Sequence, residues 1–287
     1  MKKPQWITIG VSLLLTLFIY LFANTTPPRK AVNSVAHSDD DGHDHGNTSS
    51  LTIDSILIIG KKQLNTEQVT YVNLLEQSLS RGDVKNQQMK VFHELSHFWG
   101  DSMGFFPAYA WYEAEAARLE NSEKTLTFAA RLFLEYLQRE PNPALRKWEA
   151  LQAKDLLERS LTINPDNDSA RVELGSVYLF GGISDMPMQG IAEIRKVIDK
   201  DSTNAYAQMM LARGSLLSGQ TDKAIRRLET VFKLEPGNLE AALMLADINE
   251  RLKKNEEALR WYRESLKLTE RPDIRDEIEK RIKTLSK

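Results

Sequence analysis

Apolar residues recur at three- and four-residue spacing along most of the chain from residue 51 onward. This spacing predicts amphipathic helices, because residues three and four apart share one helical face. In 66–80, for example, Val69, Val72, Leu75 and Leu79 form one such face. No strand-like segment interrupts the pattern, so we expect an all-α fold. The first predicted helices are 52–62, 66–80, one that ends near 102, 107–119, 126–137 and 144–163.

A 34-residue pattern occurs twice in direct succession between Ala205 and Pro272. The first copy holds Leu211, Ala212, Ala224, Leu228 and Pro236, and the second holds Leu245, Ala246, Ala258, Tyr262 and Glu270 at the same spacings. A fixed period of this length is typical of stacked helix–turn–helix units, since a single hairpin cannot bury its apolar face alone. The small residues are expected to let paired helices approach closely.

Further units flank this pair. Ala153, Leu157 and Pro165 reproduce the spacing of a second helix, and the next unit opens with Arg171, Leu174, Gly175 and Tyr178. That unit, 168–204, is three residues longer than its neighbours, and the surplus falls in 180–187. Residues 273–287 predict a last helix with one apolar and one charged face. Such a helix suits the open end of a helical array, which needs a polar cap.

These positions resemble the consensus of the tetratricopeptide repeat (TPR) family, W-x2-L-G-x2-Y…A-x3-F…P, with Arg171 in place of the tryptophan. The resemblance implies a right-handed superhelical array of helical hairpins that holds a protein or an extended peptide. It covers 144–272, and we expect diverged hairpins in 51–143. The clearest repeats are 168–204, 205–238 and 239–272. The family is specific for fold and unspecific for function.

The resemblance also implies a concave surface built from the first helix of each hairpin. The candidate partner-binding residues there are Val172, Ser176, Leu179, Phe180, Tyr206, Met209, Arg213, Leu217, Leu243, Asp247, Glu250 and Arg251. This surface is apolar at one end and charged at the other. The lysine and asparagine clamp of some cytosolic TPR domains is not reproduced, so we do not expect chaperone-tail recognition. A stacking contact or a solvated face remains the alternative for each residue.

The segment 6–23 carries no charged residue. A helix of about 17–25 apolar residues can cross a bilayer. Two lysines precede the segment, and the positive-inside rule then keeps residues 1–5 in the cytoplasm. We expect an uncleaved signal anchor in the inner (cell) membrane, with the bulk of the chain periplasmic or otherwise extracytoplasmic. A cleaved signal peptide is the alternative, although the residues before Ala23 make a poor cleavage site.

Residues 24–50 contain almost nothing apolar to bury and predict a disordered tether between the anchor and the folded part. His37, His43 and His45 lie there among four aspartates. Such a tract can bind a divalent metal weakly. We favour a solvated acidic spacer, because a disordered tract has no surrounding groups that orient the imidazoles.

The sequence H-E-L-S-H, which begins at His93, resembles the H-E-x-x-H signature of zinc metallopeptidases. In that alternative function, His93 and His97 bind zinc and Glu94 activates a water molecule. A catalytic zinc also needs a third protein ligand. The nearby candidates are Glu113, Glu115 and Glu120. The chain also lacks strand-like segments from which a peptidase cleft is built, so this interpretation stays second.

Composition excludes several of the remaining classes of partner and of active site. The net charge of −2 argues against a nucleic-acid partner, which usually requires a basic face. The chain has no cysteine, so disulfides, thiolate zinc sites and cysteine nucleophiles are excluded. We therefore expect a membrane-anchored TPR scaffold for protein–protein interaction, without enzymatic activity or cofactor. Its layout is similar to that of periplasmic TPR modules of bacterial cytochrome c maturation, and this analogy alone suggests a role in assembling or maturing an envelope complex.

Overall fold

The computed structural model describes residues 51–81, 84–183 and 187–286, which belong to the second of two compact units of the chain. Every regular element in these residues is helical, so the all-α prediction is confirmed for the described part. The predicted anchor at 6–23 and the predicted tether at 24–50 lie outside the described residues. No helix in the described part is both long and apolar enough to span a bilayer.

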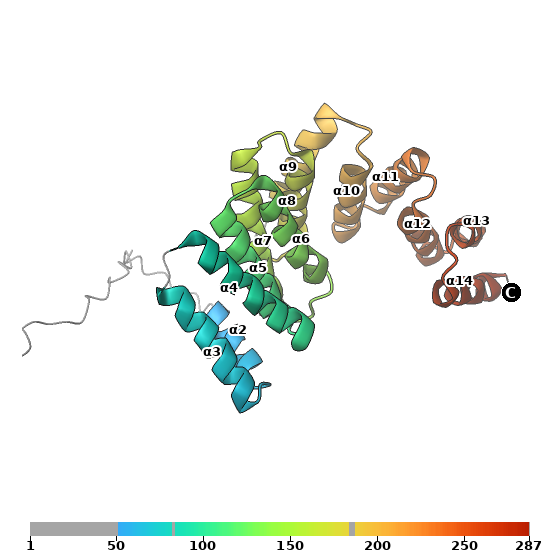
Figure 1. The fold of residues 1–287 in the computed structure, drawn as a ribbon. Helices are drawn as coiled ribbons and strands as arrows, with labels where there is room; N and C mark the ends of the chain where they lie inside the picture. The colour runs from blue at the N-terminus through green and yellow to red at the C-terminus, as the bar shows by residue number, and fades with distance from the viewer. Residues whose placement is uncertain (1–50, 82–83, 184–186, 287) are drawn as a thin grey trace, which may run out of the picture. The chain divides into compact units, whose positions relative to one another are not determined.

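The helices follow one another along the chain with short connections (Figure 1). They are α2 (Ile53–Lys61), α3 (Thr66–Arg81), α4 (Lys85–His97), α5 (Phe106–Glu120), α6 (Glu123–Leu137), α7 (Pro143–Ile163), α8 (Asp168–Phe180), α9 (Met188–Lys200), α10 (Ala205–Leu217), α11 (Thr221–Leu234), α12 (Leu239–Arg251), α13 (Asn255–Lys267) and α14 (Pro272–Leu285). A π-helical turn, Phe98–Ser102, extends α4.

From α6 onward the helices pack as pairs: α6 with α7, α8 with α9, α10 with α11, and α12 with α13. Each pair also contacts the next pair, and the first helices α6, α8 and α10 touch one another in turn. This nearest-neighbour packing is what a stacked array of hairpins requires. It leaves one side of each first helix available for a surface that runs across the hairpins.

Asparagine side chains begin several of these helices. Asn142, Asn167, Asn204 and Asn238 each accept a hydrogen bond from a backbone N–H in the first turn of α7, α8, α10 and α12. An N-cap of this kind stabilises a helix by about 0.5–2 kcal/mol. The caps on α8, α10 and α12 stand at corresponding positions, so each new hairpin begins at a defined point.

Small residues hold the two helices of each hairpin together. Ala212 and Ala224 are fully buried, and so are Ala246 and Ala258 in the next hairpin. In α8 and α9 the corresponding residues are glycines. A Cβ atom on Gly190 would lie 2.4 Å from the carbonyl oxygen of Gly175, so the two backbones approach too closely for any side chain. The surplus residues of this longer unit lie between α8 and α9, where 184–186 are outside the described part.

The last helix, α14, covers the end of the array. Ile278 is 3% exposed, and Ile274, Ile282 and Leu285 pack against the core formed by α8 to α13. These four residues form the apolar stripe seen in the sequence. The opposite face of the helix is charged, so the final hairpin does not expose its apolar side.

Candidate functional site

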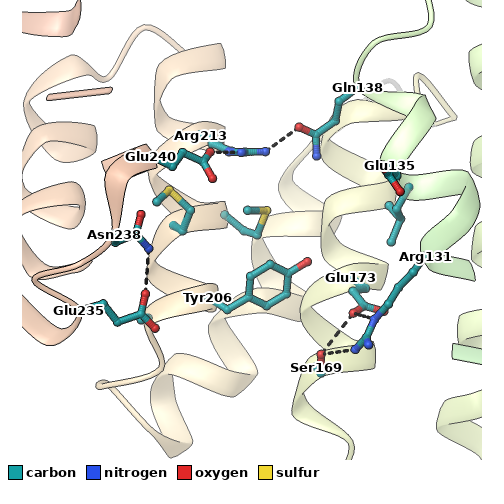
Figure 2. Close-up of a pocket in the computed structure, with 14 residues that line it drawn as sticks. Arg131, Glu135, Gln138, Ser169, Glu173, Tyr206, Arg213, Glu235, Asn238 and Glu240 are labelled. Atoms are coloured by element: carbon teal, nitrogen blue, oxygen red, sulfur yellow. Dashed lines mark hydrogen bonds and ion pairs between the residues drawn. The ribbon is translucent and has the colours of Figure 1, made fainter. Parts of the chain in front are cut away.

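An open groove of about 600 Å³ lies on the first helices of four successive hairpins, α6, α8, α10 and α12 (Figure 2). Met209 and Met210 supply apolar surface in the groove. Most of the other side chains that line it are polar or charged, and several are held by hydrogen bonds. The groove is therefore a surface with defined polar positions.

Helical spacing explains why these side chains share one surface. Arg131, Glu135 and Gln138 follow one another at four and three residues along α6 and its C-terminal cap. Tyr206 and Arg213 lie seven residues apart on α10, which corresponds to two turns. Residues at these spacings project from the same face of a helix.

A buried carboxylate anchors one wall of the groove. Glu173 in α8 is 3% exposed, and its Oε1 accepts hydrogen bonds from Arg131 Nε at 2.7 Å and from Ser169 Oγ at 3.2 Å. Its Oε2 is buried without a hydrogen-bond partner among the described residues. Burial raises the pKa of the Glu173 carboxyl, and the Arg131 guanidinium partly offsets this rise. The ion pair therefore fixes α6 to α8 at the edge of the groove.

Arg213 connects the other side of the groove. Its Nη1 donates to Gln138 Oε1 at 2.6 Å, and its Nη2 donates to Glu240 in α12 (Figure 2). A planar guanidinium suits this role, because it presents several donors in a fixed geometry. Between these contacts and Glu173 lies Tyr206, whose pKa rises to about 12 because burial and nearby Glu173 disfavour the phenolate. The Tyr206 hydroxyl therefore stays protonated well above physiological pH.

Comparison with known proteins identifies a known repeat in part of the chain. Residues 209–273 match the family model of the tetratricopeptide repeat. This part of the chain therefore contains tetratricopeptide repeats. A search of curated proteins gave no match.

One solved TPR structure shares the fold, and two other solved structures match the chain at lower scores. TTC0263, a TPR protein of Thermus thermophilus, has a TM-score of 0.50 and 15% identity, over 69% of this chain and 99% of its own. PilW, a type IV pilus biogenesis factor, has a TM-score of 0.46 and 15% identity, over 72% and 100%. MamA from Desulfovibrio magneticus has a TM-score of 0.43 and 17% identity, over 65% and 96%. At such identities, the likeness to the Thermus protein concerns fold alone.

The structure brings Tyr206, Met209 and Arg213 together in the groove, as the spacing on α10 implies. It places Val172 and Ser176 elsewhere. These two side chains are 0% and 2% exposed inside the array, and Ser176 Oγ donates to the carbonyl of Val172. Burial leaves them no surface for a partner, so their assignment to the groove surface is corrected to the core.

The remaining residues expected on the concave TPR surface lie apart from this groove. Leu179 is 9% exposed, and Phe180 is partly buried against the core. Leu217 is 64% exposed at the end of α10, and Arg251 is exposed at the end of α12. None of the four lines the groove of about 600 Å³. Their role in partner binding stays a prediction.

Leu243 and Asp247 lie in a second cavity, where α14 meets α12 and α13. There the Tyr262 hydroxyl lies 2.7 Å from Asp247 Oδ1 and 2.6 Å from Glu250 Oε2, so its one proton is shared between two carboxylate acceptors. Burial and these hydrogen bonds raise the pKa of Tyr262. Arg281 of α14 also donates to Glu250. The capping helix α14 thus forms part of the surface at this end of the array. Repeat spacing does not reveal this contact.

The sequence pattern did not assign Arg131, Glu135 and Gln138 to the site. The resemblance to the repeat consensus begins at 144, so α6 lies outside it. The reason is the length of α7, which has 21 residues where α9 and α13 have 13. The longer helix makes the unit that begins with α6 longer than the 34-residue period, so the period does not place α6 in the array. The sequence feature that could have identified these three residues is the four- and three-residue spacing of the polar side chains on α6.

The H-E-L-S-H sequence lies on α4, outside the groove of about 600 Å³. Its buried side chains are Leu95 and Ser96, while His93, Glu94 and His97 are exposed on the flank. His97 Nδ1 lies 2.9 Å from Asp101 Oδ2, and His93 Nδ1 lies 3.6 Å from Glu113 Oε1. Among the described side chains, no group of three or more His, Cys, Asp or Glu residues is arranged to hold a metal ion.

The expected third ligands have other contacts. Ser96 Oγ donates to Glu113 Oε1 at 2.5 Å, and Glu115 forms an ion pair with Arg118 at 2.7 Å. Glu120 is exposed at the end of α5. In this arrangement the histidines do not have the three converging ligands that a catalytic zinc site needs.

Proposed function

We propose that this protein is a TPR scaffold without catalytic activity, which binds an extended segment of a partner protein in the groove on α6, α8, α10 and α12. The supporting observation is the groove itself, which crosses four hairpins and is open to solvent. Small-molecule sites usually enclose most of their ligand. An open surface that crosses several elements suits a longer and more extended ligand.

We also propose that residues 6–23 anchor the chain in the inner membrane and that the array lies outside the cytoplasm, where it helps to assemble or mature an envelope complex. The uncharged run and the two preceding lysines support this proposal.

Photo-crosslinking tests the binding site in native membranes. A photoreactive phenylalanine analogue replaces Tyr206 in the groove, and in a matched variant it replaces Leu151, which is 45% exposed on α7. We expect a discrete crosslinked partner from Tyr206 and none from Leu151. The same products from both positions, or none from Tyr206, would contradict the groove as the binding site.

Protease treatment of spheroplasts tests the location. We expect externally added protease to degrade the chain, because its bulk lies outside the cytoplasm. N-terminal sequencing of the membrane-bound protein distinguishes an uncleaved anchor, which retains residues 6–23, from a cleaved signal peptide. A chain that stays intact until the membrane is lysed would contradict the proposed location.

A further inference from the structure

A third cavity, of about 510 Å³, adjoins the groove along α6. It lies between the π-helical turn after α4, the first turns of α5, and α6. Glu135 lines both cavities, so they form one continuous surface that follows α6. The groove of the four hairpins therefore extends toward the N-terminal helices.

Two aromatic side chains are exposed along this extension, and a half-buried leucine lies between them. Phe128, Leu132 and Tyr136 stand four residues apart on α6, and Phe128 and Tyr136 are 52% and 45% exposed. Tyr136 stacks on Phe106 with an angle of 12° between the ring planes, which holds the ring in place. Aromatic side chains that are fixed before binding are frequent hot spots at interfaces, because little conformational entropy is lost.

The groove and the cavity that adjoins it along α6 are both lined mainly by acidic side chains. Six carboxylates line them against two arginines. Both arginines are already paired, Arg131 with Glu173 and Arg213 with Glu240. In the part of the chain that the structure describes, Glu135 has neither an ion pair nor a hydrogen bond, although it lies where the two cavities meet. The surface therefore offers an unpaired negative charge beside an aromatic stripe.

We infer that the occupant of this surface is a basic segment of a partner protein whose apolar side chains bind the stripe Phe128, Leu132 and Tyr136 while a lysine or arginine pairs with Glu135. The inference rests on the proposed scaffold function and specifies the chemistry of its partner. The acidic stretch 38–46 of this chain contains four aspartates, and its charge excludes it as the occupant. Nucleic acid is excluded by the same sign of charge.

Fluorescence anisotropy with the full-length protein in detergent micelles tests this inference. The probe is a labelled synthetic peptide in which lysine and arginine alternate with leucine and phenylalanine. One control peptide carries glutamate at the basic positions, and another carries serine at the apolar positions. We expect only the first peptide to bind, and its affinity to fall as salt is added, since salt screens exposed charges.

Variants of α6 locate the contact. Glu135→Lys and Tyr136→Ser are each expected to weaken binding by roughly tenfold or more, as for the loss of a central interface contact. The matched control is Glu229→Lys, an equal charge change at an exposed residue of α11 that lies outside both cavities. It should leave the affinity unchanged. Circular dichroism verifies that each variant keeps its helical content.

Two results would overturn the inference: equal binding of the acidic or the serine peptide, or equal weakening by Glu135→Lys and Glu229→Lys. Sequencing the peptide crosslinked to Tyr206 separates this proposal from the scaffold function. A discrete crosslinked segment that is acidic or uncharged overturns the basic partner and leaves the scaffold standing. The absence of any crosslink in the groove contradicts both.

Discussion

Arg213 in α10 donates a hydrogen bond from Nη1 to Gln138 Oε1 at 2.6 Å, although the two residues are 75 positions apart in the chain. The contact passes over the α8–α9 hairpin and joins hairpins that are not neighbours. Arrays of this kind are usually held by contacts between adjacent repeats. A contact across one repeat therefore restricts the curvature of the groove, and Glu240 on the same guanidinium extends the link to α12.

Arg213→Ala should loosen the groove while changing stability little. A partly exposed ion pair contributes about 0–1 kcal/mol, so the free energy of unfolding should fall by less than about 1 kcal/mol. Because the chain lacks cysteine, spin labels attach only at introduced sites, such as Lys124→Cys and Lys254→Cys. We expect a broader distribution of distances between the two labels in Arg213→Ala.

Arg159→Ala is the matched control for this experiment. Arg159 pairs with Asp155 one turn away on α7, and the pair links no hairpins. The distribution of distances between the two spin labels should be the same in Arg159→Ala as in the protein without this substitution. An unchanged distribution in Arg213→Ala would show that the Arg213–Gln138 contact does not restrict curvature.

Gly190→Ala should destabilise the array by about 1–3 kcal/mol, the usual cost of overpacking a core. The added methyl group would meet the Gly175 carbonyl oxygen at 2.4 Å, and backbone atoms cannot move aside as a flexible side chain can. Urea denaturation measures the loss. Gly237→Ala is the control, because a methyl group there would meet nothing within 4 Å beyond its own chain neighbours, and its φ angle is not positive. Equal stability of the two variants would refute the close approach of α8 and α9.

Glu149→Gln should stabilise the protein at alkaline pH. Glu149 is 1% exposed, and burial, with a smaller contribution from Glu140, raises its pKa from 4.5 to about 8. Between these values the folded state keeps a proton that the unfolded state releases, so the free energy of unfolding falls as pH rises. The slope is at most about 1.4 kcal/mol per pH unit.

Urea denaturation at several pH values measures this effect. The advantage of Glu149→Gln over the unaltered protein should be small near pH 5, grow as pH rises and level off above about pH 8. Glu229→Gln, at an exposed position, should follow the unaltered protein throughout. Parallel pH profiles for Glu149→Gln and the unaltered protein would mean that Glu149 titrates normally.

Zinc binding should not depend on His93 and His97. His97 contacts Asp101, His93 faces Glu113, and the described side chains provide no third ligand at this place. Elemental analysis after dialysis against zinc should give the same content for the full chain and for a His93→Ala, His97→Ala variant. Any zinc bound by the histidines of 37–45 is present in both proteins, so it does not affect the difference between them. A loss of one zinc per chain in the variant would restore the peptidase hypothesis.

Helix positions were predicted closely because helical periodicity and helix ends are local properties. The predicted 66–80 corresponds to α3, Thr66–Arg81, and the predicted 144–163 to α7, Pro143–Ile163. The end of α4 was predicted less well. The sequence suggested one helix to residue 102, whereas Phe98–Ser102 is π-helical and its Trp99 is fully buried. Apolar spacing alone does not distinguish that turn from an α-helix.

The candidate site was predicted only in part. Spacing on α10 identified Tyr206, Met209 and Arg213, because residues three, four and seven apart share a face wherever the helix lies. It could not show that Val172 and Ser176 on α8 face the core. Which side of α8 remains open depends on how far α6 and α10 cover it, and that is a property of three hairpins together.

The sequence by itself therefore determined the helices, the hairpin repeat and the small residues at which paired helices meet. All of these depend on contacts within one hairpin or between adjacent ones. The tertiary structure alone decided that α6 joins the groove, that Gln138 meets Arg213, and that α14 shares the surface of α12. Each of these depends on the small rotation between successive hairpins, which accumulates along the array and is not encoded in any single repeat.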